Sequence, residues 1–171
     1  VDGDMRKEIF IKNYSKAVHE GYAAVFAGAG ISVSAGFVDW KNLVRPFADQ
    51  VNLDIEKEPD LVKVTQYYYN YKRSRGTVNQ EIVNAFSSNE DVTEPIAILT
   101  RLPISTYWTT NYDKLIEEGL RENNRKADVK IDEENLANNI YDRDAVVYKM
   151  HGDISSPHTA VITKDDYELY N

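Results

Sequence analysis

Three short apolar segments, each followed at once by a glycine-rich or polar turn, constrain the fold of this chain most strongly. They are residues 23–27 before Gly28-Ala29-Gly30-Ile31-Ser32, residues 104–109 before Asn111-Tyr112-Asp113, and residues 145–149 before His151-Gly152-Asp153. Short apolar runs bounded by glycine are typical of buried strands in parallel sheets. We therefore predict an α/β fold with a Rossmann-like parallel sheet flanked by helices. Because such sheets bind ligands at the carboxyl ends of their strands, the three turns are expected to meet at one crevice.

Apolar residues at helical spacing predict the elements around this sheet. We expect a helix over residues 8–20 that packs on the rest of the protein and stops at Gly21, and further helices over residues 40–51 and 114–122. Residues 59–86 form an expected helical insertion with four tyrosines, mainly packing or surface residues, with pocket lining as the alternative. The segment 23–27 is expected to be a fully buried strand, and Asp132-Glu133-Glu134 a solvated helix start.

Length and composition predict one domain, residues 1–171, and exclude several classes of function. Residues 1–4 are interpreted as an expression-vector remnant ahead of Met5. The chain has no cysteine, which excludes disulfides, thiolate nucleophiles and cysteine-based zinc sites, and its three histidines lack metal-site spacing. A net charge of −8 argues against nucleic acid as a partner. No apolar stretch approaches the roughly 20 residues that span a bilayer, so we expect no membrane association. The absence of cysteine indicates a cytoplasmic location.

The first turn suits a dinucleotide, because glycine lets the backbone come close to a phosphate. Gly28 and Gly30 could equally serve tight packing between a strand and a helix, and the two interpretations are about even. No Lys-Ser or Lys-Thr pair follows, which removes support for a Walker A loop.

The second and third turns carry the candidate catalytic side chains. Taken alone, Asn111 is more often a turn former than a catalyst, and Asp113 suits the first turn of the next helix. His151 is the strongest single candidate, because imidazole titrates near neutrality and Gly152 gives backbone room for a ligand, although lone histidines are more often structural. His19 and His158 are interpreted as surface residues.

Taken together, these segments resemble the sirtuin superfamily, whose members carry a G-A-G-I-S turn, a T-Q-N-x-D turn and an H-G pair in this order. Here they are Gly28–Ser32, Thr109–Asp113 and His151-Gly152. The runs 23–40, 102–110 and 143–153 resemble more closely the sirtuin-like effectors of the Thoeris anti-phage defence system. The resemblance implies an enzyme that cleaves NAD as its substrate, without a metal, and that forms a homo-oligomer.

Departures from the deacetylating sirtuins favour the Thoeris effectors. Without cysteine the chain cannot build a four-cysteine zinc ribbon, and residues 36–40 lack the arginine of the usual G-I-P-D-F-R stretch. Such effectors continue into further strands and into a domain that senses a cyclic ADP-ribose signal. The chain is therefore expected to be the N-terminal portion of a sirtuin-like NAD-binding catalytic domain, without the sensing domain and the residues that hold the adenosine half of NAD.

The resemblance also implies roles for individual residues. Asn111 and His151 are expected to be catalytic, Asn111 by orienting water or a ribose hydroxyl and His151 as general base. The expected NAD-binding residues are Gly28, Ala29, Gly30, Ile31, Ser32, Asp39, Thr110 and Asp113, and no metal-binding residue is expected. Asp113 is expected either to brace the Asn111 turn or to bond a ribose. The alternatives are an NAD-dependent protein deacylase and a module that senses a nucleotide without cleaving it.

Overall fold

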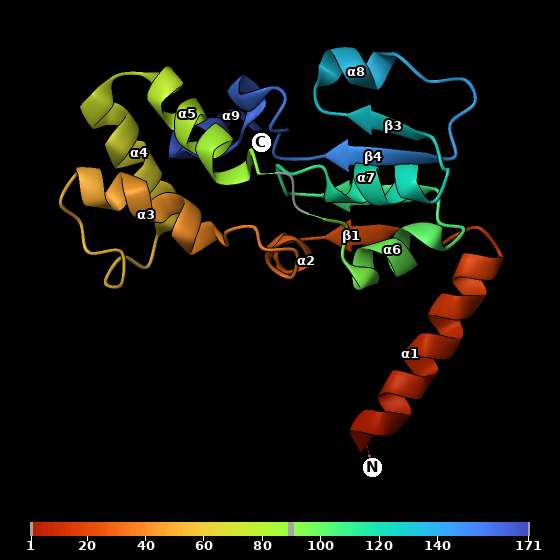
Figure 1. Cartoon of the computed structure of the whole chain (residues 1–171). Helices are drawn as coiled ribbons and strands as arrows, with labels where there is room; N and C mark the ends of the chain where they lie inside the picture. The colour runs from red at the N-terminus through yellow and green to blue at the C-terminus, as the bar shows by residue number, and fades with distance from the viewer. Residues whose placement is uncertain (1, 89–90, 171) are drawn as a thin grey trace.

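A parallel sheet forms the centre of the computed structural model, which describes residues 2–88 and 91–170. Within these residues the sheet has four strands in the order β1-β2-β4-β3 (Figure 1). They are β1 (Val25–Ala27), β2 (Thr106–Thr109), β3 (Ala127–Lys130) and β4 (Ala145–Lys149). Because all neighbours pair in parallel, the strands end at one edge of the sheet, and this confirms the predicted α/β fold.

Helices pack against one face of the sheet and build a lobe beside it (Figure 1). They are α1 (Asp2–His19), α2 (Ala29–Val33), α3 (Trp40–Gln50), α4 (Leu61–Lys72), α5 (Arg75–Phe86), α6 (Glu94–Arg101), α7 (Leu115–Glu122), α8 (Glu133–Ala137) and α9 (Lys164–Tyr170), with a 3-10 turn η1 (Pro157–Thr159). The predicted insertion, helix 40–51 and helix 114–122 are confirmed as α4 with α5, α3 and α7. Among the described residues, no helix has the length and apolar character needed to cross a membrane.

Two hydrophobic cores meet at the candidate site. One lies under the sheet and includes Tyr107, Leu120 and Val147, and the other fills the helical lobe around Phe47 and Tyr68. Ile31 packs against both cores. The turns at the strand ends therefore lie between two hydrophobic cores.

The first helix extends beyond its predicted limits and packs less than expected. It begins at Asp2, whereas Val1 lies outside the described residues, and it stops before Gly21, whose φ of 77° supports the predicted glycine stop. Tyr14, Ala17 and Val18 pack against the sheet core. Phe10 is 64% exposed, so the first half of the helix does not pack as predicted, and Figure 1 shows α1 projecting from the body.

The prediction of a fully buried first strand is wrong. β1 is an edge strand of the described sheet, and Phe26 is 66% exposed. Phe26, Trp108 and Tyr148 lie in register across one face of the sheet, and Trp108 stacks on Tyr148 with ring centroids 4.1 Å apart. The apolar sequence reflects this aromatic row as well as the buried face, and composition alone does not separate the two.

Candidate functional site

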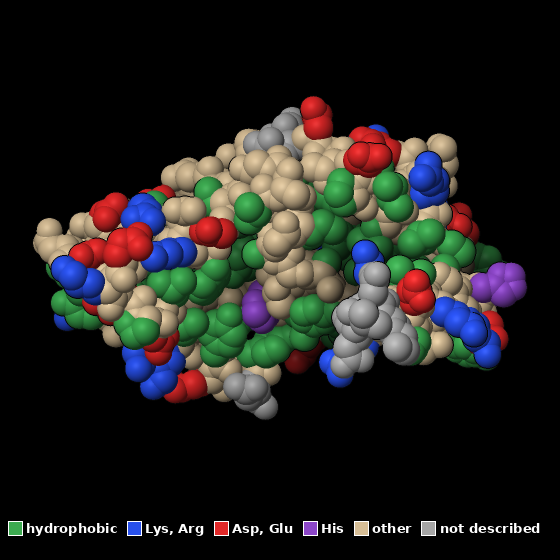
Figure 2. Space-filling model, turned by 90° about the horizontal axis from the view of Figure 1, so that it is seen from below, with side chains coloured by type: hydrophobic (Ala, Val, Ile, Leu, Met, Phe, Trp, Pro, Cys, Tyr) green, Lys and Arg blue, Asp and Glu red, His purple; other side chains and the backbone are tan. Residues whose placement is uncertain are grey.

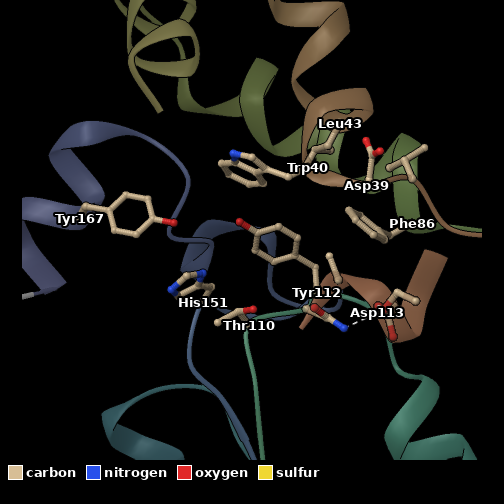
Figure 3. A pocket seen from close by; sticks show the side chains of 13 residues that line it. Asp39, Trp40, Leu43, Phe86, Thr110, Tyr112, Asp113, His151 and Tyr167 are labelled. Carbon is tan, nitrogen blue, oxygen red and sulfur yellow. Dashed lines mark hydrogen bonds between the residues drawn. The ribbon is translucent and has the colours of Figure 1, made fainter. Parts of the chain in front are cut away.

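A cavity of about 250 Å³ lies at the carboxyl ends of β1, β2 and β4. Figure 3 shows Thr110, Asp113 and His151 on its sheet side, with Trp40 and Phe86 opposite, and Figure 2 shows a histidine in a hollow walled by apolar side chains. The lining residues are Ala29, Ser32, Val38, Asp39, Trp40, Leu43, Phe86, Thr110, Asn111, Tyr112, Asp113, His151 and Tyr167. The expected meeting of the three turns is therefore confirmed.

The glycine turn leaves open space where side chains would stand. Gly28 precedes α2 with φ −107° and ψ −173°, an extended conformation that other residues adopt. A Cβ atom built on Gly28 or on Gly30 meets no atom within 4 Å. Neither backbone strain nor packing against the protein explains the two glycines. Space kept free for a ligand would explain them.

A buried hydrogen-bond network fixes the Asn111 side chain. Its Nδ2 donates to the Gly28 carbonyl at 3.0 Å and to Ser32 Oγ at 2.7 Å. Ser32 Oγ in turn donates to Asp113 Oδ2 at 2.5 Å, and Asp113 Oδ1 accepts from the Leu115 amide at 3.0 Å. Asp113 thus braces the Asn111 turn and holds the first residue of α7. Because both amide hydrogens are engaged, Asn111 Oδ1 is the atom left for a ligand; no described residue hydrogen-bonds to it.

His151 lies two residues after β4 and is half-buried. Burial lowers the pKa of its imidazole below the usual value, so the ring is neutral and able to accept a proton at neutral pH. Tyr167 packs edge-on against it, with ring centroids 5.4 Å apart. Among the described residues, none hydrogen-bonds to the imidazole nitrogens, and both remain available to a ligand.

Gly152 does not provide the backbone room for a ligand that the sequence suggests. Its φ is +92°, and a Cβ atom there would stand 2.7 Å from the backbone of Thr159. This glycine allows the turn after His151 to pack under η1. Its role is structural.

The remaining predicted binding residues differ in how they meet the cavity. Ala29, Ser32 and Thr110 line it, although the Ser32 hydroxyl is engaged in the Asn111 network. Asp39 also lines it but caps α3 by accepting from the Asn42 amide at 2.7 Å. Ile31 is a packing residue instead.

The exposure of their side chains tests the predictions for the two other histidines and for the tyrosine cluster. His19 and His158 are exposed, as predicted. Of the tyrosine cluster, Tyr68 is 2% exposed in the lobe core and Tyr67 and Tyr71 are largely exposed. The four residues of this cluster are Tyr67, Tyr68, Tyr69 and Tyr71, and none of them lines the cavity, so packing and surface roles are confirmed over pocket lining.

Several lining residues were missed by sequence reasoning. Trp40, Phe86 and Tyr112 make the apolar wall, and Tyr112 is fixed by a 2.9 Å bond from its hydroxyl to the Val161 carbonyl. Burial raises the pKa of that phenol, so it stays neutral. Tyr167 comes from α9, which was not predicted. The only sequence signal of these aromatic lining residues was their apolar spacing, and residues of the hydrophobic core have the same spacing.

A buried charged cluster lies beneath the turns. Lys149 Nζ is 3.1 Å from Asp153 Oδ2 and 3.3 Å from Glu117 Oε1, and its side chain is 0% exposed. Burial alone would lower the pKa of Lys149, but the nearby carboxylates Glu117, Asp153 and Asp113 raise it. Burial raises the pKa of Glu117, whereas Lys149 and Ser155 hold that of Asp153 low despite burial. The stable form therefore pairs Lys149 with ionised Asp153.

The described residues contain no group of three or more His, Asp or Glu side chains placed to hold a metal ion. The polar side chains that line the cavity are those of Ser32, Asp39, Thr110, Asn111, Asp113 and His151, together with those of the aromatic residues Trp40, Tyr112 and Tyr167. This set suits hydrogen bonding and proton transfer to an organic ligand.

Comparison with known proteins identifies relatives. Residues 105–171 match the family model of the SIR2-like domain. The chain is 54% identical over 165 residues to "NAD(+) hydrolase ThsA" of Bacillus cereus (strain MSX-D12), a match covering 96% of this chain and 35% of that protein. A protein of the same name from Enterococcus faecium is 46% identical over 168 residues, 98% of this chain and 35% of that protein.

A more distant relative has a related name. "Defense-associated sirtuin 2" of Bacillus subtilis is 27% identical over 188 residues, 99% of this chain and 18% of that protein. The chain spans about a third of the length of the curated ThsA relatives it matches. Residues 105–171 are therefore similar to the SIR2-like domain, and the chain is similar over nearly its whole length to the proteins named NAD(+) hydrolase ThsA.

Proposed function

We propose that this chain supplies catalytic residues for the hydrolysis of NAD to nicotinamide and ADP-ribose. The observation that carries the proposal is the meeting of three strand ends at one cavity, with Asn111 and His151 facing it beside an open glycine turn. The names of relatives at 46–54% identity support the same reaction. The cavity of about 250 Å³ lies below the roughly 300–1,000 Å³ of sites for drug-sized ligands, so it suits one half of the dinucleotide.

The proposed reaction needs placement more than a strong nucleophile. The bond between the nicotinamide nitrogen and the ribose anomeric carbon breaks, and nicotinamide leaves with the bonding electrons. A water oxygen adds to the anomeric carbon, oriented by Asn111 Oδ1, and His151 takes the water proton before releasing it to solvent. The balance is NAD⁺ and water to nicotinamide, ADP-ribose and one proton. The backbone of the glycine turn and Ala29 would approach the pyrophosphate.

Nicotinamide release from NAD by the full-length natural chain, with no acylated peptide present, tests this proposal. Release without peptide supports hydrolysis. Release that requires an acylated peptide and yields acyl-ADP-ribose would replace hydrolysis by protein deacylation. NAD binding without release would leave a nucleotide-sensing module.

Gly28→Ala should weaken NAD binding without changing the stability of the fold. The φ and ψ of Gly28 suit alanine and its Cβ meets nothing within 4 Å, so the unfolding midpoint should stay unchanged. The added methyl occupies the space proposed for the pyrophosphate, and we expect NAD affinity to fall about tenfold or more. Isothermal titration calorimetry with NAD measures this. An unchanged Kd would remove the phosphate role from the glycine turn.

The lowered pKa of His151 predicts how activity responds to pH. A general base must be neutral, so kcat/KM should fall on acidification only as pH drops through the His151 pKa. Because burial lowers that pKa, the acid limb should lie below the ordinary histidine value of about 6.5. A pH profile of kcat/KM checks this. An acid limb above that value would contradict a neutral, half-buried base.

The cellular setting forms part of the proposal. We propose that the activity depletes NAD in anti-phage defence of the Thoeris type, in the cytoplasm, within a homo-oligomer controlled by a cyclic ADP-ribose signal. The names of the relatives support the defence role. Sedimentation of the full-length chain, with and without that signal, tests the assembly.

A further inference from the structure

We propose that Lys149 is a positioning residue that holds the Asn111 turn and the His151 turn in register for catalysis. The inference rests on the proposed function, because it assigns Lys149 an effect on turnover. This role follows from where the buried Lys149 ammonium group makes its contacts.

The Lys149 ammonium joins three elements. It donates to the backbone carbonyl of Asp113, two residues after Asn111, and pairs with the carboxylate of Asp153, two residues after His151. Its third partner is Glu117 on α7. Lys149 itself ends β4, two residues before His151. One cation thus connects the turns that present both candidate catalytic side chains.

Backbone bonds hold the same two turns on either side of this cation. The Met150 amide donates to the Thr109 carbonyl at 2.8 Å, and the Ile154 amide donates to the Tyr112 carbonyl at 2.9 Å. These two hydrogen bonds join the Asn111 turn and the His151 turn at the start and at the end of their contact. Lys149 acts between them, where the chain carrying Asn111 and Asp113 leaves the sheet.

Stability does not explain a lysine in this position. Burying an ammonium group costs several kcal/mol, and apolar replacements of buried ion pairs are often neutral or stabilising. Glu117 shows the cost, since its Oε2 is buried without a hydrogen-bond partner in the described structure, although its Oε1 pairs with the Lys149 ammonium at 3.3 Å. The Lys149 ammonium donates to the Asp113 carbonyl in the Asn111 turn, and this contact fixes the position of that turn relative to β4.

A second buried lysine provides a matched control. Lys130 is 4% exposed, pairs with Asp128 at 2.9 Å, and donates to the carbonyls of Asn135 and Asn138. It has the same burial and the same kind of partners as Lys149. It lies on β3 and does not line the candidate cavity. Lys130→Met therefore carries the structural cost of losing a buried lysine without touching the site.

The first test measures turnover of the full-length chain. Lys149→Met should lower kcat for nicotinamide release about 10²-fold, the cost of a displacement near 1 Å, while KM for NAD stays within about twofold. Lys130→Met should leave kcat near wild type. If Lys149→Met folds poorly, adding Glu117→Gln and Asp153→Asn removes the unpaired carboxylates, and the loss of kcat should persist. A kcat near wild type in either Lys149 variant overturns the inference.

The second test does not depend on activity. In the 171-residue chain, the Asn111 side-chain amide signals in a ¹H–¹⁵N spectrum should shift in Lys149→Met and stay in place in Lys130→Met. Unmoved Asn111 signals in Lys149→Met overturn the inference even if turnover falls. Wild-type protein that releases no nicotinamide contradicts the proposed function instead, and the spectra then decide whether Lys149 positions Asn111.

Discussion

Replacing His151 by alanine should lower nicotinamide release from NAD by 10²- to 10⁴-fold, the usual effect of losing a general base. The imidazole is neutral, half-buried and open to the cavity, so alanine removes the proton acceptor with little repacking. The measurement is the rate of nicotinamide release at saturating NAD. His158→Ala is the matched control, because that histidine is exposed and lies outside the candidate cavity. Equal losses in both variants would remove the catalytic role from His151.

Asn111→Ala should produce a comparable loss, about 10²- to 10³-fold, because a placed polar group that acts in the transition state has that typical effect. The variant also leaves Ser32 and Gly28 without their donor, so its unfolding midpoint must be recorded. Asn111→Asp separates the two effects. It keeps an oxygen toward the cavity but cannot donate to Ser32 and Gly28. Turnover near wild type in both variants would show that Asn111 is only a turn former.

The sheet and the meeting of its turns could be predicted because their signals are local. A short apolar run followed at once by glycine or a polar turn is consistent with few structures other than a buried strand. Parallel pairing of such strands then brings their carboxyl ends to one edge of the sheet. Residues 23–27, 104–109 and 145–149 were found in this way. The positions of Asn111 and His151 at one cavity followed from the topology.

The missed elements depend on tertiary contacts. β3 has the sequence Ala-Asp-Val-Lys, and its two charged residues are buried because Asp128 pairs with Lys130 and Arg143. Such a segment shows no apolar run. α9 begins with Lys-Asp-Asp and is held by the bond from Arg75 to Asp166, 91 residues away. Neither pairing leaves a pattern in the neighbouring sequence.

Within the site, too, some roles have a local sequence signal and others depend on contacts between distant residues. Asp113 could be predicted as a helix acid and as a brace of the Asn111 turn, but the sequence does not show that the brace passes through Ser32, 81 residues earlier in the chain. Lys149 reads as an ordinary strand residue until its three partners are seen. Sequence thus indicated the residues that line the cavity better than the residues that hold them.

The turn after His151 should be intolerant of any side chain. Gly152 has φ +92°, and alanine there would bring a Cβ to 2.7 Å from the Thr159 backbone. Left-handed strain and overpacking each cost about 1–3 kcal/mol, so Gly152→Ala should destabilise the fold by about 3 kcal/mol. For a chain of this size the unfolding midpoint should fall by roughly 6–12 °C, measured by circular dichroism.

Gly76→Ala is the control for this prediction. Gly76 lies in α5, and its nearest neighbour would be 3.5 Å from the added Cβ, an ordinary contact. Alanine favours a helix over glycine by about 0.5–1 kcal/mol, so this variant should be slightly more stable. Opposite shifts of the two midpoints would establish that Gly152 is required by the packing of the His151 turn under η1. An unchanged midpoint for Gly152→Ala would show that the turn can move, and a fixed position for His151 would then lose its basis.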